Sequence, residues 1–167
     1  MKFKTIKRSL STFAVNHLLV GTRFYGLKRR LLGACGCRIG KNTRIVGPVY
    51  NTGTLIVGDN CWIGKNLTVH GNGTVTIGDN CDIAPEVMFL TGGHRIGTPD
   101  RRAGAGETYE ITVGSGTWIG ARATILKNIH VGAGTVVAAC ACVTADTGDH
   151  VLTGGVPART IGELGHG

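Results

Sequence analysis

Long hydrophobic runs and aromatic residues are scarce in this chain of 167 residues, of which 5% are aromatic. No apolar run approaches the roughly 20 residues that a transmembrane helix needs. The stretch 10–20 is interrupted by Asn16 and His17 and has no convincing cleavage site, so we expect no signal peptide. Basic residues are not interleaved with aromatic ones, which argues against a nucleic-acid partner. We therefore expect a cytoplasmic protein.

Acidic residues are absent before Asp59. The first 58 residues contain eleven Lys and Arg, so the net charge of +8 is an N-terminal property. Residues 9–32 predict one or two helices with a loosely one-sided apolar pattern. One interpretation is a helix that caps the open end of a repeat fold. The other is peripheral contact with the anionic inner face of a membrane.

The six cysteines do not form a zinc-finger pattern. The C-x-C pairs at 35–37 and 140–142 lack a further pair at the required spacing. Cys61 and Cys81 occupy equivalent repeat positions, which predicts small core residues. No second histidine lies near His94, and His70 and His130 fall at different repeat positions. We expect reduced thiols and no bound metal.

The abundant feature is a period of six. An aliphatic or aromatic residue recurs at every sixth position, with Asn51 as the one polar exception and a two-residue insertion between Val69 and Ile77: Ile39, Ile45, Val57, Ile63, Val69, then Ile77, Ile83, Phe89, then Val113, Ile119, Ile125, Val131, Val137 and Val143. The fifth position of each hexad is also small or apolar. A period of six is typical of a parallel β-helix with three faces and roughly 18 residues per coil. The alternative, a β-sandwich, would space its strands by about 8–12 residues without a strict period. We predict an all-β solenoid of about five coils between Ile39 and Val143.

The period fails between Phe89 and Val113. Continuing the count would place Arg95, Arg101 and Glu107 inside the prism, where unpaired charges are unfavourable. Residues 90–112 are therefore predicted to leave the coil as a long excursion, and such loops are usually functional or disordered. His94 stands at its root. An imidazole there could act as a general base, although a lone histidine is more often structural.

Several motifs in the repeat region resemble the hexapeptide-repeat acyltransferases of the galactoside and maltose O-acetyltransferase type. They are IGDN at 77–80, IAP at 83–85, GH at 93–94, WIG at 118–120, VGAG at 131–134, VTAD at 143–146 and GVPAR at 155–159. The match covers about residues 73–162. Polysaccharide O-acetyltransferases and serine acetyltransferases share this architecture.

The resemblance implies that the β-helix, over 39–162, is left-handed. Charge and residue pattern predict a basic helical segment (1–38) before it, where the family's N-terminal region has no convincing match, and a short tail (163–167) follows. The resemblance also implies acetyl-CoA as co-substrate, a homotrimer with sites between subunits, and a carbohydrate acceptor such as a cell-surface glycan or its precursor. His94 matches the family's catalytic base. The positions that match coenzyme A contacts are Ala121, Ala139, Thr144 and Arg159.

Three further residues are predicted to contact the acceptor. Asn72 falls near an acidic sugar-contacting position of galactoside enzymes, Glu107 lies in the excursion, and Trp118 follows its return. Trp62 occupies the same repeat position as Trp118, so scaffold packing is the alternative for Trp118. The chain also departs from the family, because Ala145 replaces a lysine expected near a phosphate. Lys127 or Arg159 could take over that contact.

Two other functions stay open at this point. One is acyl transfer to serine or another small molecule, although the segment before the repeats is short for that type. The other is a non-catalytic β-helix that serves as an assembly module. The intact GH, WIG and GVPAR motifs favour an enzyme.

Overall fold

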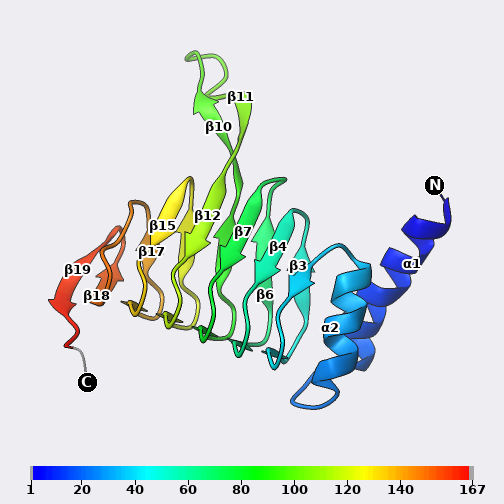
Figure 1. Cartoon of the computed structure of the whole chain (residues 1–167). Coiled ribbons are helices and arrows are strands. Elements are labelled where there is room, and N and C mark those ends of the chain that lie inside the picture. The colour runs from blue at the N-terminus through cyan, green and yellow to red at the C-terminus, as the bar shows by residue number, and fades with distance from the viewer. Residues whose placement is uncertain (1, 166–167) are drawn as a thin grey trace.

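Three parallel sheets form the sides of a prism, and the chain visits them in turn (Figure 1). The computed structural model describes residues 2–165, and side chains from residue 8 onward. The first sheet contains β1 (Arg38–Ile39), β4 (Thr54–Val57), β7 (Thr74–Ile77), β12 (Glu110–Val113) and β15 (Ile129–Val131). The second contains β2 (Arg44–Ile45), β5 (Trp62–Ile63), β8 (Asp82–Ile83), β13 (Trp118–Ile119), β16 (Val136–Val137), β18 (Val151–Gly155) and β19 (Ala158–Glu163). The third contains β3 (Val49–Asn51), β6 (Leu67–His70), β9 (Met88–Leu90), β14 (Thr124–Leu126) and β17 (Cys142–Val143).

The described strands make five complete coils and, with β18, the start of a sixth. This confirms the predicted solenoid. The register stacks equivalent hexad positions, so that Val57 pairs with Ile39 on one side and with Ile77 on the other. β19 then folds back antiparallel onto β18 and ends the stack.

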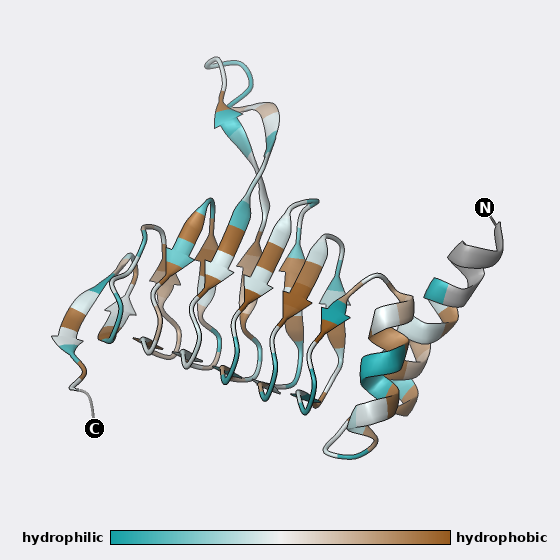
Figure 2. Ribbon diagram, in the orientation of Figure 1, coloured by the Kyte–Doolittle hydropathy of each residue, from teal (hydrophilic) through white to brown (hydrophobic). Residues whose placement is uncertain are grey.

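The core is a set of inward columns, as the period of six predicts. Every aliphatic or aromatic first position from Ile45 to Val143 is buried, and the alternation of apolar and polar residues along the strands is visible in Figure 2. Cys61 and Cys81 are buried in this core, which confirms their prediction as small core residues. The polar exception, Asn51, is only half-buried, and its amide bonds the Gly53 N–H at 3.0 Å and the Cys37 Sγ at 3.5 Å.

Close packing between coils explains the glycines after the first hexad position. A Cβ on Gly58 would lie 2.2 Å from an Asp79 carboxylate oxygen and 2.7 Å from the Gly78 carbonyl carbon. The left-handed backbone of the corners lies at the asparagines two residues later, with φ of 57° at Asn42 and 56° at Asn60, because Asn tolerates this region. The glycines are there because the next coil leaves no room for a side chain.

The excursion is an antiparallel β-hairpin, made of β10 (Gly92–Ile96) and β11 (Ala103–Thr108), which projects far from the prism (Figure 1). The predicted limits of 90–112 were too wide. Leu90 ends β9, Thr91 is buried, and Ile111 is buried in β12 beside Val113. Residues two apart in a strand face the same side, so Ile111 and Val113 both point inward. Arg95 and Arg101 lie exposed on the hairpin, which confirms that they leave the core.

Helices cover the N-terminal end of the stack. They are α1 (Lys2–Phe13), the π-helical turn η1 (Ala14–Leu18) and α2 (Tyr25–Ala34). The Asn16 side chain pairs with the backbone of Val49, donating to its O at 3.1 Å and accepting from its N at 2.9 Å. The ammonium of Lys28 is fully buried and donates to the carbonyls of Gly21, Ile45 (2.8 Å) and Val46 (3.0 Å). The contacts to Ile45, Val46 and Val49 satisfy backbone groups on the open side of the first coil, as a cap must.

Candidate active site at the hairpin corner

The hairpin leaves the prism at the corner between the third and the first sheet. We call this the hairpin corner: residues 92–109 together with the turns 71–73, 127–128 and 144–146 of neighbouring coils. Two hollows lie there, and His94 and Glu107 border both. The corner therefore joins the excursion to turns that are distant in sequence.

His94 is exposed on β10, and its Nδ1 lies 2.8 Å from the carbonyl oxygen of Gly104 on β11. A carbonyl can only accept a hydrogen bond, so this contact places the proton of the neutral ring on Nδ1. Nε2 then keeps its lone pair, which is the form that a general base requires. The hairpin thus fixes both the orientation and the tautomer of the ring.

The face of the hairpin opposite to the His94 side chain contains an ion pair. Arg95 Nε lies 2.8 Å from Glu107 Oε1, and the Tyr109 hydroxyl donates to Glu107 Oε2 at 3.0 Å. The hydrogen bond from Arg95, followed by that from Tyr109, holds the pKa of the Glu107 carboxyl below its usual value. Desolvation and then the bond to Glu107 raise the pKa of the Tyr109 hydroxyl. A Cβ on Gly93 would lie 2.6 Å from the Tyr109 oxygen, so this cluster needs glycine at position 93.

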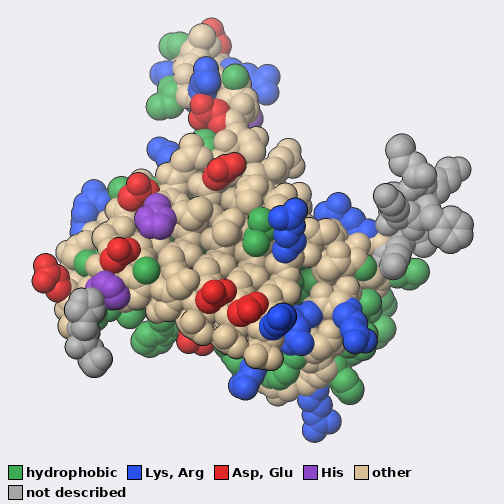
Figure 3. Space-filling model, viewed as in Figure 1, with side chains coloured by type: hydrophobic (Ala, Val, Ile, Leu, Met, Phe, Trp, Pro, Cys, Tyr) green, Lys and Arg blue, Asp and Glu red, His purple; other side chains and the backbone are tan. Residues whose placement is uncertain are grey.

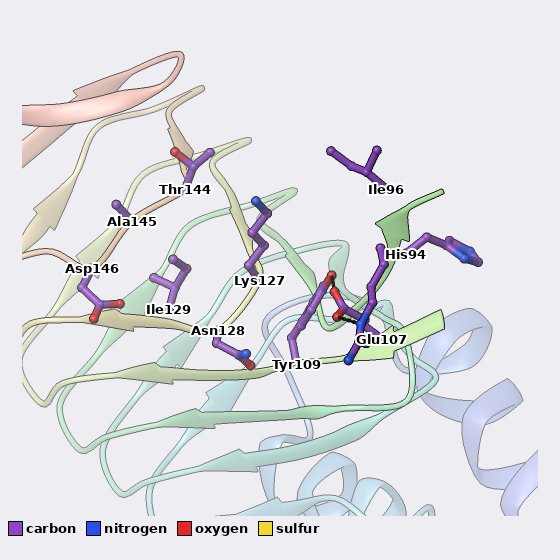
Figure 4. Close-up of a pocket in the computed structure, with 11 residues that line it drawn as sticks. His94, Ile96, Glu107, Tyr109, Lys127, Asn128, Ile129, Thr144, Ala145 and Asp146 are labelled. Atoms are coloured by element: carbon purple, nitrogen blue, oxygen red, sulfur yellow. Dashed lines mark hydrogen bonds and ion pairs between the residues drawn. The ribbon is translucent and has the colours of Figure 1, made fainter. Parts of the chain in front are cut away.

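The two hollows lie on opposite sides of the hairpin. The first, of about 590 Å³, includes Arg95, Lys127 and Thr144 in its lining (Figure 4). The second, of about 550 Å³, includes His70, Asn72 and Thr108. Figure 4 shows the ring of His94 pointing away from Lys127 and Thr144. Strand alternation explains this, because His94 and its neighbour Arg95 must face opposite sides.

The structure brings together only some of the residues that the sequence predicts. Asn72 lines the second hollow with His94, Thr144 lines the first, and Glu107 borders both. Thr144 shares the first hollow with Ala145 and Lys127, so the Lys127 ammonium lies at the corner where the family lysine is missing.

The remaining predicted residues lie elsewhere on the molecule. Ala121 and Ala139 stand at the corner between the second and third sheets, where the Cys140 N–H donates to the Ala121 carbonyl at 2.9 Å. We call this the Ala121 corner: the turns 64–66, 84–86, 120–122 and 138–140. Trp118 is 55% exposed on the second sheet, and Arg159 lies on β19. None of these four lines either hollow at the hairpin corner.

Sequence reasoning missed Arg95 and Tyr109 as partners of Glu107. Their signal was strand alternation, since Glu107 and Tyr109 are two residues apart and share a face. The period of six did not reveal this alternation, because it shows only that the excursion lies outside the repeat. Among residues 2–165 no group of three or more His, Cys, Asp or Glu is placed to hold a metal ion.

Comparison with known proteins assigns the chain to a family. The model for the bacterial transferase hexapeptide (six repeats) matches residues 110–145, and that for the hexapeptide repeat of succinyl-transferase matches residues 54–84. A Saccharomyces cerevisiae protein named as a candidate acetyltransferase is 33% identical, over 81% of this chain and 68% of its own length. The chain therefore belongs to the hexapeptide-repeat acetyltransferases.

Within that family, the chain is similar to galactoside O-acetyltransferases. It is 35% identical to galactoside O-acetyltransferase of Escherichia coli (strain K12), over 75% of this chain and 63% of that protein. A solved structure of a galactoside acetyltransferase in complex with coenzyme A superimposes with a TM-score of 0.81 at 27% identity, covering 98% of this chain and 82% of that one. The present chain thus spans somewhat less than two thirds of the Escherichia coli protein.

Proposed function

We propose that this protein transfers an acetyl group from acetyl-CoA to a sugar hydroxyl, with His94 as the general base. The observation that carries the proposal is the bond between His94 Nδ1 and the Gly104 carbonyl, at 2.8 Å. It leaves Nε2 as the proton acceptor at the edge of a hollow large enough for a small ligand. The family membership supplies the class of reaction.

The proposed step is a direct transfer. His94 Nε2 takes the proton of the acceptor hydroxyl while that oxygen attacks the thioester carbonyl carbon. The new C–O bond forms, the C–S bond breaks, and the coenzyme A thiolate leaves and recovers the proton from His94. A backbone N–H would stabilise the oxyanion that develops in between.

The two corners of the prism support a site shared between subunits. Ala121 and Ala139 cannot join His94 within one chain, because they lie at a different corner of the same rigid prism. In a homotrimer, the Ala121 corner of one subunit can lie beside the hairpin corner of the next. Coenzyme A would then lie along Ala121 and Ala139 of one subunit and reach His94 of its neighbour.

In this shared site, basic side chains at the two corners could contact the coenzyme A phosphates. Arg122, next to Ala121, is bound to Glu86 of the preceding coil at 2.6 Å, which leaves it a weaker phosphate ligand. Lys127 lies exposed beside Thr144, where the family lysine is replaced by Ala145. We therefore assign Lys127, together with Arg159, to the phosphates.

The acceptor that fits best is a carbohydrate. The second hollow is lined by polar groups that bind hydroxyls, including the imidazole of His70, the Asn72 amide and the Thr108 hydroxyl. Trp118, exposed on the second sheet, would offer a neighbouring subunit an aromatic surface for the sugar ring. A cell-surface glycan or its cytoplasmic precursor agrees with the galactoside O-acetyltransferase likeness.

Acetylation of a glycan panel tests the proposal. Purified protein is incubated with acetyl-CoA and with galactosides, maltosides, polysaccharide fragments or serine, and the products are analysed by mass spectrometry. We expect a sugar product carrying one added acetyl group. Transfer to serine alone would replace the sugar acceptor by a small-molecule one. No transfer to any acceptor, together with no calorimetric binding of coenzyme A, would favour a non-catalytic module.

A further inference from the structure

The helical cap exposes a group of large apolar side chains. Of the eleven large hydrophobic residues exposed among the described side chains, six lie between positions 10 and 27. We call them the apolar cap surface: Leu10 (65% exposed), Phe13 (54%), Leu18 (70%), Val20 (43%), Phe24 (65%) and Leu27 (45%). Single exposed apolar residues are ordinary, but a concentration of them on one short segment indicates an interaction surface.

These side chains are not needed to close the prism. The inward side of the cap is already made by Val15, Asn16, Lys28 and Leu32, which are all buried. Asn16 and Lys28 bond the backbone of the first coil directly. The cap therefore has an inward side docked on the coil, whereas the apolar cap surface stays exposed.

The charge around this surface has one sign. Eleven Lys and Arg and no Asp or Glu occur in residues 1–58, and among these Arg8, Arg23 and Arg30 are exposed on the cap. Figure 3 shows hydrophobic and basic side chains interspersed over the helical end, whereas Asp and Glu lie over the coils and the hairpin. Apolar side chains flanked by cations match the interface of an anionic lipid bilayer.

We propose that the apolar cap surface docks the protein on anionic membranes, with the apolar side chains inserted at the headgroup boundary and the arginines against lipid phosphates. No helix within residues 2–165 has the length and apolarity to span a bilayer, and the proposed contact is peripheral. The hairpin leaves between the third and fourth coils, roughly 12 Å along the stack from the first coil. Docking through the cap would therefore hold the hairpin corner close to acceptors that are attached to lipid.

Flotation of the full-length protein with vesicles tests the docking. The vesicles are phosphatidylcholine alone, or phosphatidylcholine with phosphatidylglycerol, at low and at high salt. We expect binding to the anionic vesicles that weakens with salt. Arg23→Ala and Arg30→Ala should each lower the affinity about fivefold. Phe24→Ser should lower it about tenfold, because its ring is expected to enter the bilayer. Ile161→Ser is the matched control, since Ile161 is 63% exposed but lies at the opposite end of the stack.

Four results would overturn the proposal. The first two are no binding to anionic vesicles and equal binding to neutral and anionic vesicles. The third is that Ile161→Ser lowers the vesicle affinity as much as Phe24→Ser does. The fourth is that the arginine substitutions lower the affinity whereas Phe24→Ser leaves it unchanged. Sedimentation without lipid adds a fifth: self-association that Phe24→Ser abolishes would assign the surface to a second copy of the chain. Acetyl transfer to a water-soluble acceptor is measured without vesicles, so failure of the docking and failure of the proposed enzymatic function are distinguishable.

Discussion

Replacing His94 separates its chemical role from its structural one. Asparagine can place its Nδ2 near the position of the imidazole Nδ1, so His94→Asn can retain the bond to the Gly104 carbonyl (2.8 Å). It cannot replace Nε2, because its amide nitrogen is not basic. His94→Ala loses both groups. If Nε2 is the base, both variants should lose the same activity.

The size of the loss follows from the exposure and the chemistry of the residue. A general base contributes about 10²–10⁴-fold to a rate, or about 3–5 kcal/mol of transition-state stabilisation. The stability cost should be far smaller, below about 1 kcal/mol, because His94 is exposed and makes a single hydrogen bond to a backbone carbonyl. The thermal midpoint should therefore stay within a few degrees of the wild type.

The assay is the release of coenzyme A thiol from acetyl-CoA, with and without the acceptor that the glycan panel identifies. His130→Asn is the control, since His130 also bonds through Nδ1, at 2.8 Å from Thr112 Oγ1, but lies outside both hollows. We expect its activity to be unchanged. Activity of His94→Asn near the wild-type level, with His94→Ala inactive, would refute the base and leave only the hydrogen bond. Full activity in both variants would remove His94 from the reaction.

Three further predictions concern the hairpin and the cap. Gly93→Ala should displace the Tyr109 ring, because the new Cβ would lie 2.6 Å from its oxygen; we expect a lower kcat with a nearly unchanged thermal midpoint. The pKa of Glu107 is lowered in the folded protein, so its ionised carboxylate stabilises the hairpin. This stabilisation should be complete above the ordinary carboxyl pKa of about 4.3 and disappear as the pH falls through the lowered pKa. The protection factor of the hairpin amides, which is the intrinsic exchange rate divided by the observed rate at the same pH, should therefore fall in acid in the wild type, but in Glu107→Gln it should be low at every pH. Lys28→Met should cost about 2–4 kcal/mol, because three carbonyls lose their buried donor, and calorimetry should show a midpoint lower by about 10 °C.

Repeat and strand patterns predicted most of the fold. The period of six located the inward columns from Ile45 to Val143, because stacked coils repeat the same environment at each turn. The limits of the excursion were less accurate, although the sequence contained the missing signal. Ile111 occupies the fifth, apolar position of its hexad and is fully buried, so the coil resumes before Val113.

The hairpin itself could not be predicted. Its strands, AGAGET and GGHRI, have no apolar alternation, because the hairpin projects into solvent and has no core to face. The pairing of Arg95 with Glu107 depends on the register of β10 against β11. Register is specified weakly where neither face is buried.

The sequence by itself determined the solenoid, the point at which the chain leaves it, and the histidine at that point. The period of six marks the buried positions, and charged residues at those positions mark where the chain leaves the core. Only the tertiary structure decided that His94 bonds Gly104, that it faces away from Glu107, and that Ala121 and Ala139 stand at another corner of the prism. The basic N-terminus was open to two interpretations. The structure shows that its inward side caps the coil through Lys28 and Asn16, while apolar and basic side chains of the cap stay exposed. The physical reason is the same in each case: a repeat fixes each residue's position within its coil, but contacts between an excursion and distant turns depend on distances that no periodicity encodes.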